Sequence, residues 1–200
     1  MELRLPRLLI TADLPDTLTG LGGISPLERL RCSGRILGFR EARILSNSVE
    51  AVAAHLAEAS WHATDVASQF RERTNADVTG GEVNNCLATM NASHRKRLLV
   101  IFGNCYCDVR LLRALAKAQR DSVLIDSDPP VVVAPLWKGR AQVFCAALLS
   151  SEWLSGKDRD RSLMEEFAAD LGYGDLRDPH LSRCADSIVD LTRSEADLAD

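Results

Sequence analysis

The sequence predicts an α/β fold, a three-layer sandwich with a mostly parallel central sheet of about six strands and helices on both faces. Two observations favour it. Short apolar runs alternate with segments of helical period, which implies βαβ crossovers and parallel pairing. The clearest run, Leu98–Phe102, has five consecutive apolar residues between a basic run and Gly103. Such a run is typical of a central strand that is covered on both faces.

The remaining elements follow in order from this alternation. The first strand is expected at Pro6–Thr11 and the second at Ala42–Leu45. Between them, Ser25-Pro26-Leu27-Glu28 predicts a helix start, because it has a capping Ser, a Pro at the first position and a Glu three residues after the cap. The later expected elements are a helix after Ser48, one through Val83 and Leu87, one after Asp108, strands at Ser122–Ile125 and Val131–Ala134, and helices at about Arg140–Trp153 and Ser162–Leu171.

Composition narrows the class of protein. Apolar residues make up 46% of the chain and charged residues 26%, which is the ordinary globular range. The net charge is −4 and the basic residues are scattered, so no nucleic-acid partner is expected. No apolar run approaches the ~20 residues that span a bilayer, so we expect no membrane association and a cytoplasmic protein. One domain over residues 1–177 and an acidic tail over 178–200 account for the length.

The six cysteines do not predict a metal site. No two of them have the C-x-x-C spacing of a zinc site, and the histidines do not cluster with them. Disulfides are not expected in the cytoplasm. The sequence therefore predicts neither a metal nor another cofactor.

The chemistry-bearing residues gather after the Leu98 strand. Gly103, Asn104 and Cys105 lead from it into a helix whose positive end favours a thiolate. Cys105 is thus a candidate nucleophile, and the turn at Gly103 and Asn104 could stabilise an oxyanion. His62 is the candidate base, since His94 lies at the far end of the strand. The alternative is that Cys105 is simply a small residue in a tight turn.

The order of elements and the Cys105 turn resemble the caspase-like and metacaspase domains of bacteria. The segments that carry the resemblance are the opening strand at Arg7–Ile10, the helix that ends at Leu37-Gly38-Phe39, the strand that leads to Cys105, and Val143–Leu149, which resembles a helix of that family. The resemblance implies a Cys105/His62 dyad that cleaves peptide bonds. It also implies a protein or peptide partner in a bacterial death or defence system.

The sequence departs from that family at several positions. It contains no His-Gly pair, and Gly103 stands where the family often has an acidic residue. Two hypotheses follow from the resemblance: a degenerate pseudo-peptidase that acts as a protein-interaction module, which we favour, or an active cysteine endopeptidase. Asp128 and Trp137, which lie near the late strands, are candidates for lining a pocket.

A third hypothesis from another class is a module that binds a nucleotide or another small molecule. The glycines of Gly20-Leu21-Gly22-Gly23 precede a helix, but they come about nine residues after the first strand, out of register with the dinucleotide-binding fingerprint. Fold alone does not separate these classes.

Overall fold

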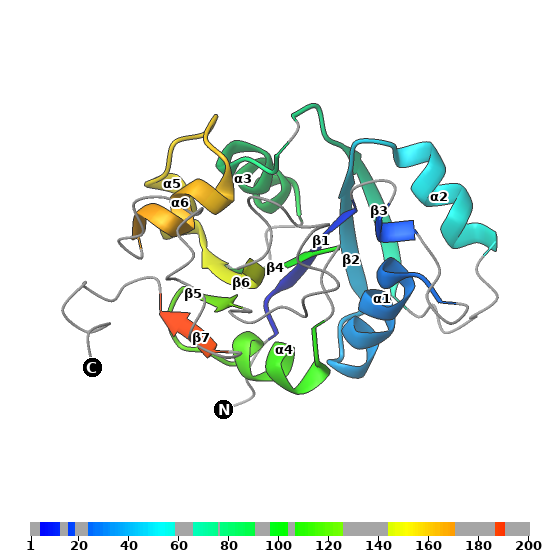
Figure 1. Cartoon of the computed structure of the whole chain (residues 1–200), viewed down its shortest axis with the longest axis horizontal. Helices are drawn as coiled ribbons and strands as arrows, with labels where there is room; N and C mark the ends of the chain where they lie inside the picture. Colours follow the sequence, from blue (N-terminus) through cyan, green and yellow to red (C-terminus); the bar gives the residue numbers. More distant parts are fainter. Residues whose placement is uncertain are drawn as a thin grey trace.

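In the described part of the chain, the computed structural model has a seven-stranded sheet with helices packed on both faces (Figure 1). The structure describes residues 5–12, 16–18, 24–58, 66–75, 77–90, 97–103, 107–125, 144–170 and 187–190. This arrangement confirms the predicted α/β class, and five of the seven strands point the same way.

The elements alternate along the chain as the sequence predicts. In chain order they are β1 Arg7–Ala12, the 3-10 turn η1 Asp16–Leu18, α1 Pro26–Ile36, β2 Glu41–Ser46, α2 Val49–Glu58, β3 Ala67–Glu72, α3 Gly80–Thr89, β4 Arg97–Phe102, α4 Val109–Ala116, β5 Ser122–Ile125, β6 Phe144–Ser150, α5 Ser151–Ser155, α6 Leu163–Asp170 and β7 Ser187–Asp190.

The strand order across the sheet is β3-β2-β1-β4-β6-β5-β7. Strands β1 to β4 pair in parallel, whereas β6 runs antiparallel between β4 and β5. Strand β7, which lies in the stretch assigned to the acidic tail, pairs antiparallel with β5 at one edge. The Leu98–Phe102 run forms the body of β4 and is buried at the centre of the sheet, as predicted.

Alternate side chains of β1 show which helices cover which face. A Cβ atom on Gly34 of α1 would lie 2.9 Å from the side chain of Leu8. The neighbouring residue, Arg7, donates instead to the carbonyl of Leu87 in α3, at 2.7 Å. Because successive side chains of a strand point to opposite faces, α1 and α3 cover opposite faces of the sheet.

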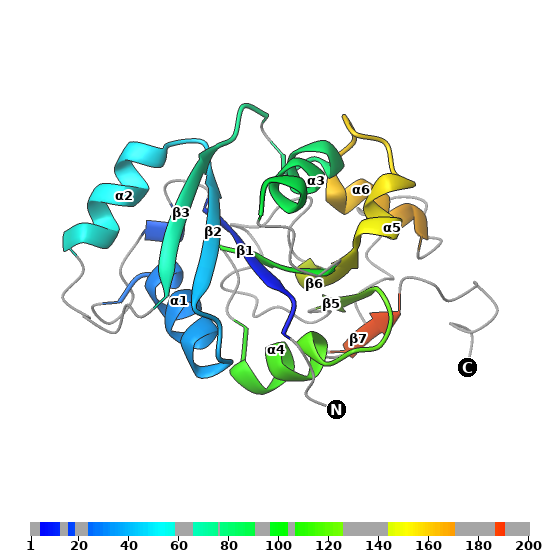
Figure 2. The ribbon, with the colours of Figure 1, turned by 180° about the vertical axis from the view of Figure 1, so that it is seen from behind.

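The remaining helices follow the same division. Arg97 of β4 shares the face of Leu8, and it donates to the carbonyl of Ala118, just after α4, at 2.6 Å. Figures 1 and 2 both show α1 and α4 on one side of the sheet and α3, α5 and α6 on the other. No helix in the described part of the chain is long and apolar enough to cross a membrane.

Two local expectations met different outcomes. The helix expected at about Arg140–Trp153 is wrong, because Phe144–Ser150 forms strand β6 and only the short helix α5 follows it. Residues 145–149 are buried between β4 and β5, and a run buried on all sides has no periodicity that separates strand from helix. The expected strand at Val131–Ala134 lies outside the described residues.

Candidate functional site

The carboxyl edge of the sheet is where β1, β2, β3 and β4 all end, because these strands are parallel. Ligands of open α/β sheets bind beyond this edge. Each of the helices α1 to α4 begins after one of these strands or after the loop that follows it. The described residues at this edge therefore form the candidate site.

The ends of β1 and β4 are held unusually close together. The amide of Gly103 donates to the hydroxyl of Thr11 at 3.3 Å. A Cβ atom on Gly103 would lie 1.9 Å from the carbonyl oxygen of Thr11 and 3.0 Å from the methyl group of Thr17 in η1. Both threonines are buried. Only glycine permits this approach, which joins the two central strands at the point where their loops leave the sheet.

The start of α1 forms a second polar cluster at this edge. Ser25 and Glu28 form the predicted capping box: the Ser25 amide donates to the Glu28 carboxylate at 2.7 Å, and the Glu28 amide donates to the Ser25 hydroxyl at 3.2 Å. His55 of α2 adds a third member, with its Nε2 atom 2.9 Å from the Ser25 hydroxyl oxygen and 3.4 Å from the Glu28 carboxylate. This contact ties α2 to the first turn of α1.

These contacts also set the charge of Glu28. Burial alone would raise the pKa of its carboxyl group, but the hydrogen bonds from Ser25 and the neighbouring His55 outweigh burial and lower the pKa below the ordinary value. A carboxylate at the first turn also complements the positive end of the helix dipole. The Glu28 carboxylate therefore already offsets the partial positive charge at the start of α1.

The ends of β2 and β3 are linked in a similar way. The Ser46 hydroxyl accepts from the Ser48 amide at 3.0 Å, and the Arg73 amide donates to the Ser46 carbonyl at 2.7 Å. The side chain of Arg73 is only 4% exposed. A buried arginine therefore lies just beyond the carboxyl end of β3.

The start of α3 is closed to a ligand by the chain itself. The amides of Gly80 and Gly81 donate to the carbonyls of Arg161 and Arg159, at 3.2 and 2.9 Å. A Cβ atom on Gly81 would lie 2.7 Å from the Arg159 carbonyl oxygen. The two glycines therefore serve a close backbone contact, and they leave no free amides there for an anion.

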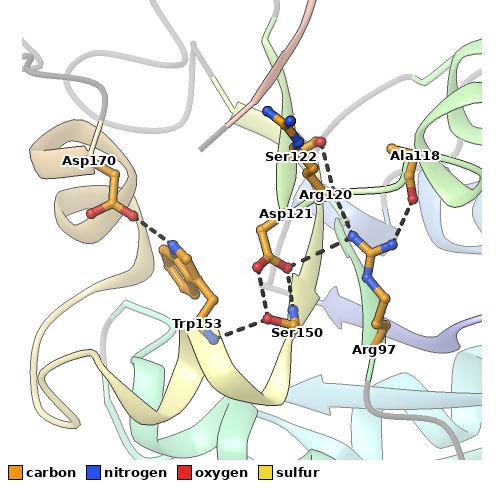
Figure 3. Close-up of polar contacts among 8 residues, drawn as sticks. All are labelled: Arg97, Ala118, Arg120, Asp121, Ser122, Ser150, Trp153 and Asp170. Atoms are coloured by element: carbon orange, nitrogen blue, oxygen red, sulfur yellow. Dashed lines mark hydrogen bonds and ion pairs between the residues drawn. The ribbon is translucent and has the colours of Figure 1, made fainter. Parts of the chain in front are cut away.

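A polar network at the opposite edge of the sheet is structural (Figure 3). Asp121 accepts from the amide and the hydroxyl of Ser150, at 2.5 and 2.7 Å, and lies 3.9 Å from the Arg97 guanidinium. The same Ser150 hydroxyl accepts from the Trp153 amide at the start of α5, at 3.1 Å. Because Asp121 and Ser150 bond to each other and to their neighbours, the network fixes the exit of β6.

The indole of Trp153 extends this network to α6 (Figure 3). Its Nε1–H donates to the Asp170 carboxylate at 2.6 Å, and its ring packs on Phe167, with the centroids 5.5 Å apart. Lys157 lies 4.9 Å from the indole centroid and pairs with Asp170 and Glu166. These contacts hold α6 against α5.

The predicted site residues fall mostly outside the described part of the chain. The structure describes Gly103 and places it at the end of β4, beside Thr11. Cys105, His62, Asn104, Asp128 and Trp137 lie in stretches that it does not describe. Thr11, Thr17 and the His55 contact were missed by the sequence analysis, since single hydroxyl groups and one helix histidine form no pattern. Among the described residues, no group of three His, Cys, Asp or Glu side chains could hold a metal ion.

Comparisons with known proteins give a match in structure alone. No protein-family model matches the chain. No curated protein matches it in sequence.

Many solved structures share the fold, and among them are three nucleotide-related enzymes of known name. A putative glucose-1-phosphate thymidylyltransferase from Bacillus anthracis has 12% identity and a TM-score of 0.60, covering 84% of this chain and 83% of its own. The inositol-1-phosphate CTP transferase from T. maritima has 10% identity and a TM-score of 0.58, covering 86% and 83%. A UDP-glucose pyrophosphorylase in complex with UDP-glucose has 9% identity and a TM-score of 0.51, covering 76% and 78%.

These neighbours overturn the resemblance to caspases. The pseudo-peptidase hypothesis and the alternative of an active Cys105/His62 endopeptidase are both wrong, because the matching structures are nucleotidyltransferases. The sequence segments that suggested caspases share only an order of strands and helices, which many α/β folds have in common. At these levels of identity the comparison establishes the fold, and the chain has the fold of these nucleotidyltransferases.

Proposed function

We propose that this chain is a nucleotidyltransferase-like domain that binds a nucleoside triphosphate at the carboxyl edge of its sheet and transfers the nucleotidyl group to a phosphate carried by a sugar or cyclitol. The observation that carries the proposal is the similarity of fold over more than three-quarters of each chain. The names of the three neighbours refer to glucose 1-phosphate, UDP-glucose and inositol 1-phosphate as substrates or ligands.

The proposed reaction joins a phosphate oxygen of the acceptor to the α-phosphorus of the triphosphate. The bond from that phosphorus to the oxygen bridging toward the β-phosphate breaks, and pyrophosphate leaves with the electron pair. Phosphoryl transfer of this kind depends mainly on positioning and on electrostatic stabilisation. The contribution of this chain would be a rigid edge, and the contact of Gly103 with Thr11 supports that role because it fixes two neighbouring strand ends.

The test begins with binding. We expect one of the five triphosphates ATP, GTP, CTP, UTP and dTTP to bind the purified chain saturably in isothermal titration with Mg²⁺ present. With that triphosphate, pyrophosphate release should require glucose 1-phosphate or inositol 1-phosphate. Binding of none of the triphosphates would refute the proposal. Binding without pyrophosphate release from any pair would refute the transfer and leave a nucleotide-binding domain.

Two matched variants place the site. Thr11→Val removes the hydroxyl that accepts the hydrogen bond from the Gly103 amide. We expect roughly tenfold weaker triphosphate binding, because the end of β4 is no longer fixed. Thr89→Val removes a similar hydroxyl at the opposite edge, where it accepts from Arg43 and donates to the Asn85 carbonyl. Binding should be unchanged in that variant. Equal losses in both would argue against a site at the carboxyl edge.

A further inference from the structure

Among the strands that the structure describes, β3 lies at one edge of the sheet and pairs with β2 alone. In Figure 2 it runs along the outside of the sheet, with α2 beside it. Most of its residues are exposed, whereas in β1 and β4 every residue after the first is buried. An open edge of this kind presents unpaired backbone groups that can pair with another strand.

The hydrogen bonds of β3 show which of its residues face outward. The amides of Ala67 and Arg73 donate to carbonyls on the β2 side, at 2.8 and 2.7 Å. In a parallel ladder, alternate residues turn both the amide and the carbonyl to the same neighbour. The intervening set, Ser68, Phe70 and Glu72, therefore turns its amides and carbonyls away from the sheet.

Among the described residues, the side chains of these three form no hydrogen bond or ion pair. Phe70 is 36% exposed and is one of two exposed large apolar residues in the described part of the chain. The Ser68 hydroxyl is covered but makes no hydrogen bond. Glu72 is exposed and forms no ion pair with any described residue. All three point to the same face, since they alternate along the strand.

We propose that β3 pairs antiparallel with the β3 strand of a second copy of this chain, around a two-fold axis at Phe70. In this register Phe70 lies against the partner's Phe70, and their backbones form a hydrogen-bonded pair. Ser68 lies opposite the partner's Glu72, on the same face as Phe70. On the other face, Gln69 lies opposite the partner's Arg71. The result is one continuous sheet through both copies.

The charges of the strand select this register among those with the same outward-facing residues. A shift by two residues in one direction would place Arg71 opposite the partner's Arg71, and directly opposed like charges are destabilising. A shift in the other direction would set Phe70 against Ser68 and leave the Glu72 carboxylate beside an apolar residue, Val66. The strand is thus complementary to itself, which favours a closed dimer over an unrelated peptide.

Sedimentation velocity of the full chain over a range of concentrations tests the proposal. The wild-type chain should form a dimer that dissociates on dilution. Phe70→Asp should weaken dimerisation roughly a hundredfold, because it removes two apolar contacts and opposes two carboxylates. Ile36→Asp changes the other exposed large apolar residue, at the end of α1, and should leave the dimer intact. A monomer at every concentration, or a dimer that survives Phe70→Asp, would overturn the proposal.

Amide hydrogen exchange of the wild-type chain tests the same edge without any variant. The outward amides of Ser68, Phe70 and Glu72 should exchange slowly at high concentration and quickly on dilution. Amides that point toward β2, such as that of Arg73, should stay protected throughout. Outward amides that are protected at every concentration would show that the edge is covered within one copy, and outward amides never protected would show that it stays open. Either result overturns the dimer.

Discussion

The substitution Gly103→Ala tests the close contact between the ends of β1 and β4. The added Cβ atom would lie 1.9 Å from the carbonyl oxygen of Thr11, whereas real Cβ atoms essentially never come within 3.0 Å. The two backbones must therefore separate by about 1 Å in the centre of the sheet. Overpacking of this kind costs about 1–3 kcal/mol. Weakening of the hydrogen bond to Thr11 adds about 0.5–1.5 kcal/mol.

We therefore expect Gly103→Ala to lower the free energy of unfolding by roughly 2–4 kcal/mol. For a chain of this length the midpoint of thermal unfolding should fall by roughly 4–16 °C. Urea denaturation followed by far-UV circular dichroism measures the first quantity, and a thermal scan measures the second.

Gly34→Ala is the matched control. Its Cβ atom would meet only the end of the Leu8 side chain, at 2.9 Å, and that end can rotate away. Alanine in a helix interior also gains about 0.5–1 kcal/mol over glycine, so this variant should stay within about 1 kcal/mol of the wild type. If Gly103→Ala were as stable as Gly34→Ala, the reasoning about the strand ends would be refuted.

Three further outcomes are expected. Glu28→Gln should destabilise the chain at neutral pH and progressively less as the pH falls below 4.5, because a pKa lowered on folding gives stability that is present above the unfolded value and lost as the pH falls through the folded one. Urea melts that show the same loss at neutral and acid pH would contradict this. Asp121→Asn should cost about 1–3 kcal/mol in urea denaturation, since Ser150 loses a charged acceptor, and a neutral result would mean that the network is not structural. Trp153→Phe keeps an aromatic ring but loses the hydrogen bond to Asp170, so the free energy of unfolding should fall by about 1 kcal/mol. If the ring contact contributes more than this hydrogen bond, Asp170→Asn should have a smaller effect.

Much of the fold could be read from local patterns. The apolar run of β4 and the capping box of α1 are each typical of one kind of structure, and both were predicted at the observed positions. Strand β6 could not be read in this way, because an apolar run buried on all sides fits a strand or a helix equally well. Its antiparallel insertion between β4 and β5 is set by tertiary pairing, and no local signal in the run specifies it.

Strand β3 is polar along most of its length, and it lies at an edge of the sheet, where polar residues are tolerated. The candidate site was harder to predict. Gly103 was singled out as part of an oxyanion turn, but its observed role depends on Thr11, which is distant in sequence and carries no motif. His55 was similarly unremarkable until the fold brought it to Ser25. The error about caspases arose because an order of elements does not determine which strands become neighbours.

The position of β6 has a consequence for the chain as it leaves the ribosome. One edge of β4 pairs with β6, and Leu98 of β4 pairs there with Leu149, about fifty residues later in the chain. That edge therefore stays unpaired until β6 has been synthesised. Until then, β1 to β4 can assemble with α1 to α3, but an apolar central strand stays open on one side. Nascent chains that stop before β6 would therefore expose that strand to other molecules. The stretch from residue 104 to 143 thus sets the length of time for which the growing protein is vulnerable to aggregation.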